Sequence, residues 1–186
     1  MRNVIVTAGY INPAPLRELC AVLDAAHLDI KAMSDAFYRD VCQASLAPVL
    51  RSAEIMRETG LHLELSNLVI PTLNDTDSHF RDLCRWVVAH LGAETPMHFL
   101  RFFPLYRMTH LPPTPAETLT RARDIARAEG LKHIYVGNLE VPEGEDTFCA
   151  SCGQPLIRRL RHTVTENLLK AGKCPACGHA AYGVWS

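Results

Sequence analysis

Two pairs of cysteines near the end of the chain have the spacing of a metal site. They are Cys149-x-x-Cys152 and Cys174-x-x-Cys177, and a glycine follows each pair. Four thiolates in two such turns can surround one tetrahedral metal ion, and glycine lets each turn close tightly so that backbone amides face the sulfurs. Because four cysteines fill the coordination sphere, we predict a structural zinc site. Iron in a rubredoxin-like or auxiliary-cluster site is the alternative metal, and two disulfides are the alternative without a metal.

Polar side chains at the ends of apolar segments form a second set of candidates, because ligands of parallel α/β sheets bind at the carboxyl ends of the strands. Asp29 and Lys31 are two residues apart, so on a strand they face the same side. A charged pair on a buried strand is costly unless it is paired internally or used for binding. Arg101 suits a carboxylate or phosphate, with a structural tether as the alternative. The residues predicted to line one cleft are Thr7, Asp29, Lys31, Asn67 and Arg101.

The elements that must position these residues alternate between strands and helices. Apolar runs predict strands within residues 4–6, 28–31, 61–70, 97–103 and 133–136. Apolar faces at helical spacing predict helices that begin near residue 12 and near residue 114, and helices over 48–59 and 75–91. Thr114 and Glu117 have the spacing of a capping box, with Pro115 at the first helical position.

This order predicts the α/β fold class, with parallel strands joined by right-handed crossovers. The repeats are too few for a full eight-unit barrel, so we expect a partial (β/α) barrel over residues 1–140. Residues 141–186 are expected to form a polar linker followed by a small zinc-ribbon-like module.

Composition limits the partners and the cellular compartment expected for the protein. The net charge is −1 and the pI is about 6.7, which gives no global attraction to nucleic acid or anionic membrane. Cys20, Cys42 and Cys84 are scattered and have no pairing pattern, as is usual in a reducing compartment. The chain opens with no secretory signal and has no apolar run of membrane-spanning length. We therefore expect a cytoplasmic protein without a membrane partner.

Several short motifs occur in a fixed order along the chain: TAGYI (7–11), LDIK (28–31), LVIPTLND (68–75), RFFP (101–104), YRMT (106–109), PPTP (112–115), YVGN (135–138) and the two cysteine pairs. Taken together, these motifs resemble radical S-adenosylmethionine (SAM) enzymes of the pyruvate-formate-lyase-activating-enzyme type. More narrowly, they resemble the radical SAM member of the AmmeMemoRadiSam system. The resemblance implies that Asp29 and Lys31 help to hold SAM, that Thr7 lies near the same pocket, and that the strand end at Val69 lines the adenosyl site.

The chain also departs from that family. The C-x3-C-x2-C motif that holds the family's 4Fe-4S cluster does not occur in this sequence, and the chain begins at what resembles a middle strand of the barrel. The family usually has asparagine at the position of Ala8 and often has histidine at the position of Phe103. We therefore expect the C-terminal part of a radical SAM enzyme, inactive alone, whose partner is an N-terminal cluster-bearing segment or another protein of the system.

A different function class remains as an alternative, in which the metal ribbon is a binding module for nucleic acid or a protein. Residues 149–186 carry five basic side chains, Arg158, Arg159, Arg161, Lys170 and Lys173, against the single acidic residue Glu166. Basic zinc ribbons can bind nucleic acid. A solvated surface that offsets the charge of the metal-thiolate centre explains the same pattern, and we expect no nucleic-acid partner.

Overall fold

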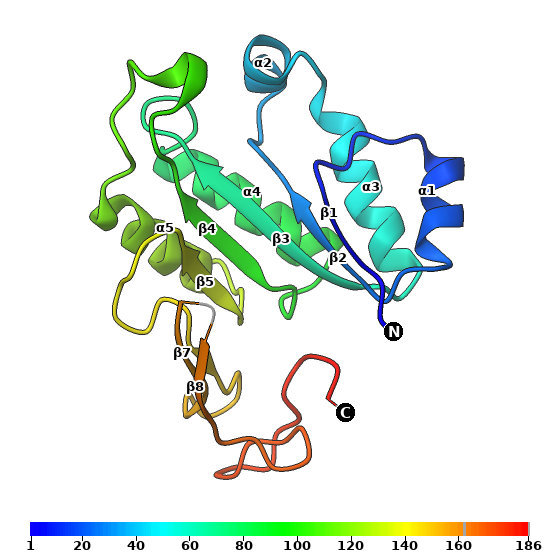
Figure 1. Cartoon of the computed structure of the whole chain (residues 1–186), viewed down its shortest axis with the longest axis vertical. Helices are drawn as coiled ribbons and strands as arrows, with labels where there is room; N and C mark the ends of the chain where they lie inside the picture. The colour runs from blue at the N-terminus through cyan, green and yellow to red at the C-terminus, as the bar shows by residue number, and fades with distance from the viewer. Residues whose placement is uncertain (162, 186) are drawn as a thin grey trace.

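A parallel sheet of five strands forms the centre of the molecule, in a computed structural model that describes residues 1–161 and 163–185 (Figure 1). The strands lie side by side in the same order as in the sequence, and each neighbouring pair is parallel. This confirms the predicted α/β class. The strands are β1 (Val4–Thr7), β2 (Ala25–Asp29), β3 (His62–Val69), β4 (Met97–Arg101) and β5 (Ile134–Gly137).

Four longer helices connect consecutive strands and cover one face of this sheet (Figure 1). They are α1 (Pro13–Cys20), α3 (Leu46–Glu58), α4 (Asp77–His90) and α5 (Ala116–Ala128). Three short elements lie in the loops after β2 and β4: α2 (Asp35–Phe37), a π-helix η1 (Tyr38–Cys42) and a 3-10 helix η2 (Tyr106–Met108). No helix within the described ranges, 1–161 and 163–185, has both the length and the hydropathy that crossing a bilayer requires.

The two faces of the sheet differ in chemistry because side chains alternate along each strand. Leu28, Leu65 and Phe99 point towards the helices and are fully buried in the main hydrophobic core. The face without helices instead carries polar side chains. The register on that face pairs His27 with Glu64 on neighbouring strands, and Asp29 with Ser66. A parallel sheet with helices on one side and a polar inner side is half of a (β/α) barrel in its architecture.

The start of α5 corrects one expectation from the sequence. The helix has Pro115 as its N-cap residue, without a side-chain cap, so the capping box at Thr114 is not formed. Thr114 is fully buried, and its hydroxyl accepts from the Phe102 amide (2.8 Å) and donates to the Val69 carbonyl (2.6 Å). These backbone groups at the ends of β3 and β4 are buried and need hydrogen-bond partners. The Thr114 hydroxyl bonds to them and is therefore not used to cap α5.

A small antiparallel sheet follows β5 and carries the cysteine pairs (Figure 1). Its strands, in spatial order, are β6 (Thr147–Phe148), β7 (Pro155–Leu160) and β8 (Thr163–Asn167). Cys149 and Cys174 are buried together with Leu156 and Ile157 in a separate small core. The C-terminal segment returns to the large sheet, where the ring of Tyr182 lies 5.4 Å from that of His62.

Candidate functional site

The four predicted metal ligands converge on one point. Sγ of Cys149 lies 3.6 Å from Sγ of Cys177, and Sγ of Cys152 lies 3.7 Å from Sγ of Cys174. All four sulfurs lie within 4.8 Å of one another. A tetrahedral ion with metal–sulfur bonds of about 2.3 Å holds its ligands about 3.8 Å apart. The thiols fit one such ion, and they are too far apart for the two disulfides that the sequence left open.

Both cysteine turns are closed by the glycine that follows them. The amide of Gly153 donates to the Cys149 carbonyl, and the amide of Gly178 donates to the Cys174 carbonyl, each at 2.9 Å. Both glycines have φ +74°, which strains any other residue. Backbone N–H groups, first that of Cys177, hydrogen-bond the Cys174 sulfur and lower its pKa to about 7. The second turn therefore favours the thiolate form of Cys174 that binds metal. At Cys152 a backbone hydrogen bond at Gln154 acts in the same direction, but burial and the neighbouring thiols outweigh it and raise the pKa to about 12.

The three arginines of the ribbon each contact other groups of the chain. Arg158 forms an ion pair with Asp146 at 3.0 Å, and Arg161 forms one with Glu140. Arg159 donates to the hydroxyl of Thr147 at 2.8 Å. Guanidinium groups held in this way are poorly placed to release counterions from a phosphate backbone. This pattern does not favour the nucleic-acid alternative.

Asp29 and Lys31 lie at the carboxyl end of β2, on the face of the sheet without helices. Lys31 Nζ is 2.5 Å from Asp29 Oδ2, and the Ser66 hydroxyl donates to the other carboxylate oxygen. The side chains remain 31% and 28% exposed, so solvent and ligands reach the pair. The Tyr38 hydroxyl accepts from the Lys31 amide at 3.0 Å and fixes the backbone there. The internal ion pair considered above is therefore formed, and it is accessible.

The other predicted cofactor residues face the opposite side of the sheet. Thr7 is the register partner of Leu28, and Val69 is the register partner of Arg101. Leu28 directly precedes Asp29 in β2, so its side chain points to the face opposite to that of Asp29 and Ser66. Asn67 and Val69 are fully buried. The prediction that one cleft is lined by Thr7, Asn67 and Arg101 together with Asp29 and Lys31 is therefore wrong.

Two of these residues have evident structural contacts. Arg101 Nε donates to the Thr114 carbonyl at 3.0 Å, and its guanidinium lies 5.0 Å from the centre of the Phe103 ring. This is the tether that the sequence left open. The Thr7 hydroxyl accepts from the Gly9 amide at 3.0 Å. A role of Thr7, Asn67, Val69 or Arg101 in cofactor binding stays a prediction.

Two buried asparagines hold the backbone at Lys31 against the end of β3. Asn67 Nδ2 donates to the carbonyls of Ile30 (2.8 Å) and Lys31 (3.0 Å). Asn74 Nδ2 donates to the Lys31 carbonyl (2.7 Å), while its Oδ1 accepts from the Ile70 amide (2.6 Å). These two buried asparagines thus fix the backbone that carries Lys31, and they do so without lying on the helix-free face beside the ion pair.

We expect Asn74→Ala to lower the free energy of unfolding by about 3 kcal/mol, because it leaves buried backbone groups without partners at roughly 1–3 kcal/mol each. Urea unfolding followed by circular dichroism measures this change. Asn12→Ala is the matched control, since Asn12 is exposed and makes no side-chain cap to α1. Equal stability of the two variants would contradict a positioning role for Asn74.

Sequence reasoning missed a cluster of titratable groups in the middle of the open face. Its members are His27, Glu64 and His98, one from each of three neighbouring strands. Hydrogen bonds from His62 and His98 hold the Glu64 pKa well below its usual range. Burial, and then the nearby His98, lower the pKa of His27. The available signal was weak, because these residues are far apart in sequence and only strand register brings them together.

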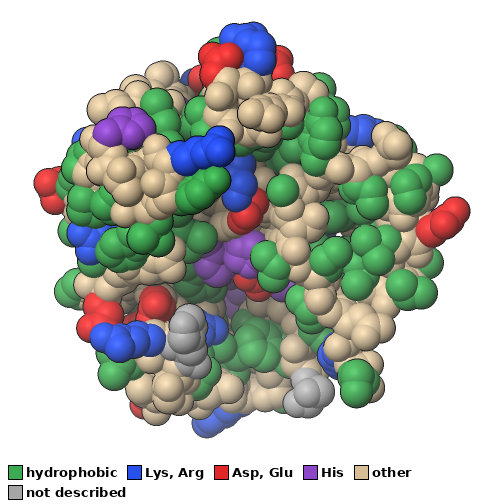
Figure 2. Space-filling model, turned by 45° about the horizontal axis from the view of Figure 1, so that its top comes forward, with side chains coloured by type: hydrophobic (Ala, Val, Ile, Leu, Met, Phe, Trp, Pro, Cys, Tyr) green, Lys and Arg blue, Asp and Glu red, His purple; other side chains and the backbone are tan. Residues whose placement is uncertain are grey.

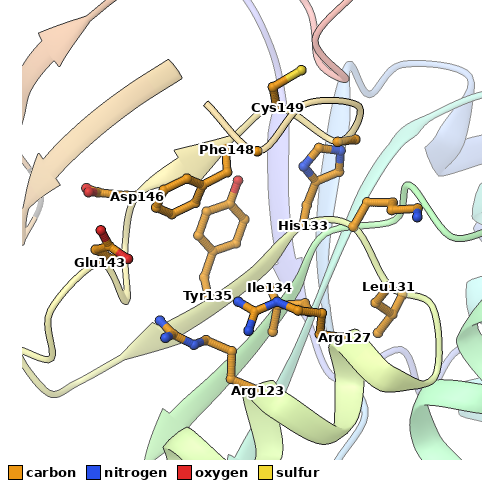
Figure 3. A pocket seen from close by; sticks show the side chains of 13 residues that line it. Arg123, Arg127, Leu131, His133, Ile134, Tyr135, Glu143, Asp146, Phe148 and Cys149 are labelled. Carbon is orange, nitrogen blue, oxygen red and sulfur yellow. The ribbon is translucent and has the colours of Figure 1, made fainter. Parts of the chain in front are cut away.

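A separate cavity of about 370 Å³ lies where α5 and β5 meet the cysteine ribbon (Figure 3). Arg123 and Arg127 of α5 line it, together with Asp146 of the linker and Cys149. Its lining comes from α5, β5, the linker and the first cysteine turn, and not from the ends of β2 and β3. The cavity thus lies between the large sheet and the ribbon, and its lining carries both basic and acidic side chains.

Comparison with known proteins finds one long sequence relative. The chain is 43% identical over 180 residues to the uncharacterized protein MJ0808 of Methanocaldococcus jannaschii. The match covers 96% of the chain and 53% of that protein, so the chain spans about half the length of this relative. No family model matches the chain.

Two solved structures share the fold. A domain of pyruvate-formate lyase-activating enzyme from Bacteroides vulgatus matches with a TM-score of 0.63 and 14% identity, over 74% of the chain and 82% of that domain. A radical SAM methyltransferase from Sphaerobacter thermophilus matches with a TM-score of 0.59 and 17% identity, over 82% of the chain and 43% of that enzyme. Likeness at such low identity concerns the fold alone. The chain therefore has a radical-SAM-like α/β fold followed by a four-cysteine module that could hold a metal.

Proposed function

We propose that this chain is the C-terminal part of a radical SAM enzyme of the activating-enzyme type, belonging to the AmmeMemoRadiSam system. The observation that carries this proposal is the accessible Asp29–Lys31 pair at the strand ends of a radical-SAM-like sheet. In this proposal the cluster-binding motif is carried by another stretch of polypeptide, because the C-x3-C-x2-C motif does not occur in this sequence.

Asp29 and Lys31 have the chemistry to hold SAM. The ammonium of Lys31 can neutralise the methionine carboxylate, and the Asp29 carboxylate can accept from the amino or ribose groups. Ser66 and Tyr38 keep the pair in place before any ligand arrives. In this proposal Asp29 and Lys31 would bind and orient SAM, while a reduced cluster held by the other stretch of polypeptide would supply the electron for cleavage of the sulfonium.

The three cysteines outside the ribbon do not fit an iron-sulfur cluster. Cys20 and Cys84 are buried on helices, and Cys42 is exposed on η1. Burial raises the pKa of Cys84 to about 12, and also raises that of Cys42. Cluster ligands must be thiolates, so these thiols are poor candidates. No step through a cluster is assigned to this chain.

The free edge of the large sheet suits docking of a further strand. β1 is an edge strand, and Val4 and Val6 on it are 64% and 73% exposed. At the opposite edge, the Val136 amide of β5 already donates to the Gly144 carbonyl at 2.8 Å. Unpaired backbone groups beside exposed valines are a template for strand addition. A segment with the missing barrel strands would extend the sheet at β1.

We also propose that the metal at the four cysteines is zinc in a structural role. The closed, four-sulfur ligand set leaves no position for a substrate. Four cysteines assigned to a metal and three without a disulfide partner fit a reducing compartment such as the cytoplasm.

Cleavage of SAM tests the main proposal. After anaerobic reconstitution with iron and sulfide and reduction with dithionite, the chain alone is expected to form no 5′-deoxyadenosine. Adding the part of the Methanocaldococcus jannaschii relative that the chain does not match should restore cleavage. Cluster-dependent product from the chain alone would refute the split arrangement and point to unexpected cysteine ligands.

In the restored mixture, Lys31→Met is expected to raise the KM for SAM by about 10- to 100-fold, the loss of one charged hydrogen bond of roughly 1.5–3 kcal/mol. Lys132→Met, at an exposed lysine outside this face, is the control and should leave KM unchanged. An unaltered KM in the Lys31 variant would remove that residue from the SAM site.

A further inference from the structure

The three side chains missed by sequence reasoning meet in one place on the helix-free face. His27 and Glu64 are register partners on β2 and β3, and His98 projects from β4 on the same side. Their ligand atoms all lie within 4.8 Å of one another. His98 Nε2 lies 2.8 Å from Glu64 Oε2, and the rings of the two histidines are 5.1 Å apart. Two imidazoles and one carboxylate therefore converge from three strands.

The cluster lies in a hollow that solvent can reach. Figure 2 shows histidine side chains gathered in a recess near the centre of the view. A cavity of about 540 Å³ is lined by the three residues together with Tyr135 and Arg159. Glu64 remains 33% exposed and His98 remains 23% exposed. The site has room for an ion and for molecules bound to that ion.

Neighbouring side chains fix the orientation of the cluster. His62 Nε2 lies 3.2 Å from Glu64 Oε1, so a second imidazole holds the carboxylate oxygen that points away from His98. The ring of His98 stacks on that of Tyr135 at 4.8 Å. Hydrogen-bonded and packed ligands of this kind are typical of metal sites, where an outer shell orients the residues that bind the ion.

The cluster differs from the simple histidine–glutamate pairs elsewhere in the fold. His90 pairs with Glu54 at 3.0 Å, and His133 pairs with Glu94 at 2.8 Å. In the described parts of the chain, the pair of His98 and Glu64 is the one that has a further histidine, His27, with a ring nitrogen within ligand distance. His27 makes no side-chain hydrogen bond within the described residues, so its ring nitrogens are available to a ligand.

We propose that His27, Glu64 and His98 bind one divalent transition-metal ion, of which Zn²⁺ is the natural probe. Imidazole and carboxylate together suit Zn²⁺ and similar ions, and three protein ligands leave at least one coordination position open. This site is separate from the four cysteines, whose sulfur set is closed. It lies on the same face as Asp29, two residues along β2 from His27. A ligand on the ion and a ligand on the strand-end pair would therefore share one surface.

Metal stoichiometry of the full reduced chain tests this proposal. After equilibration with excess Zn²⁺ and removal of unbound ion, we expect two zinc ions per chain. His98→Ala and His27→Ala should each retain one, and His98→Gln should behave in the same way while preserving side-chain volume and a polar contact to Glu64. His62→Gln should bind the second ion about 10- to 100-fold more weakly, as expected for an orienting residue. His90→Ala is the matched control and should retain two.

Cobalt distinguishes the sites by absorption. Co²⁺ at the cysteines gives intense thiolate charge-transfer bands, which every variant above should keep, and this also reports that the ribbon is folded. Co²⁺ at the second site adds only weak visible bands, which the His27 and His98 variants should lose. One ion in the wild-type chain, or two ions in the folded His27→Ala and His98→Ala variants, would overturn the proposal.

Discussion

Replacing Cys174 by serine is expected to release the bound metal and unfold the ribbon that contains it. Cys174 is buried, and its sulfur is one of four within 4.8 Å. The small core around it consists of four residues, so the metal rather than apolar burial must hold this module together. Structural zinc contributes on the order of 10 kcal/mol to such modules. Metal analysis and hydrogen exchange of residues 147–185 measure the two losses, while the large sheet should remain protected.

Cys42→Ser supplies the control for this experiment, because Cys42 is an exposed free thiol outside the ribbon. That variant should keep its metal and its exchange protection. A Cys174→Ser chain that retained stoichiometric metal and a protected ribbon would contradict the four-sulfur site. A strong visible absorption band in the purified wild-type chain would replace zinc by iron in the assignment.

Phe80→Ala is expected to lower the free energy of unfolding of the large domain by about 3–5 kcal/mol. Phe80 is fully buried on α4, and its ring meets that of Phe99 on β4 edge-on at 5.6 Å. Removing the ring leaves a cavity between the helix layer and the strand that carries His98. Urea unfolding monitored by far-ultraviolet circular dichroism gives the change.

Phe103→Ala is the same substitution at a 47% exposed ring, which lies 5.0 Å from the Arg101 guanidinium. We expect it to cost about 1 kcal/mol or less. Comparable destabilisation by both variants would mean that α4 does not pack on β4 as the structure has it.

Local sequence patterns were enough to predict the main strands and helices of the large sheet and the four-cysteine site. Apolar runs and helical spacing fix secondary structure locally, so the order of strands and helices, and with it a parallel sheet, could be predicted from residues a few positions apart. The cysteine pairs could be recognised for the same reason, because each turn brings two sulfurs together within four residues. The accessible Asp29–Lys31 pair was also local, since the chain stays extended just past the end of β2 and residues two apart in an extended chain share a face.

Which residues from different strands meet could not be predicted in the same way, because it depends on how the strands align in the folded sheet. Register is set by packing across the sheet, and a shift of one residue moves a side chain to the other face. For this reason Asn67 and Val69 are buried on the face that the helices cover, whereas Asp29 lies on the opposite face. The same rule unites His27, Glu64 and His98, which are more than thirty residues apart in sequence. Thr114 likewise joins two strand ends instead of capping a helix, because backbone groups buried there have no other partner.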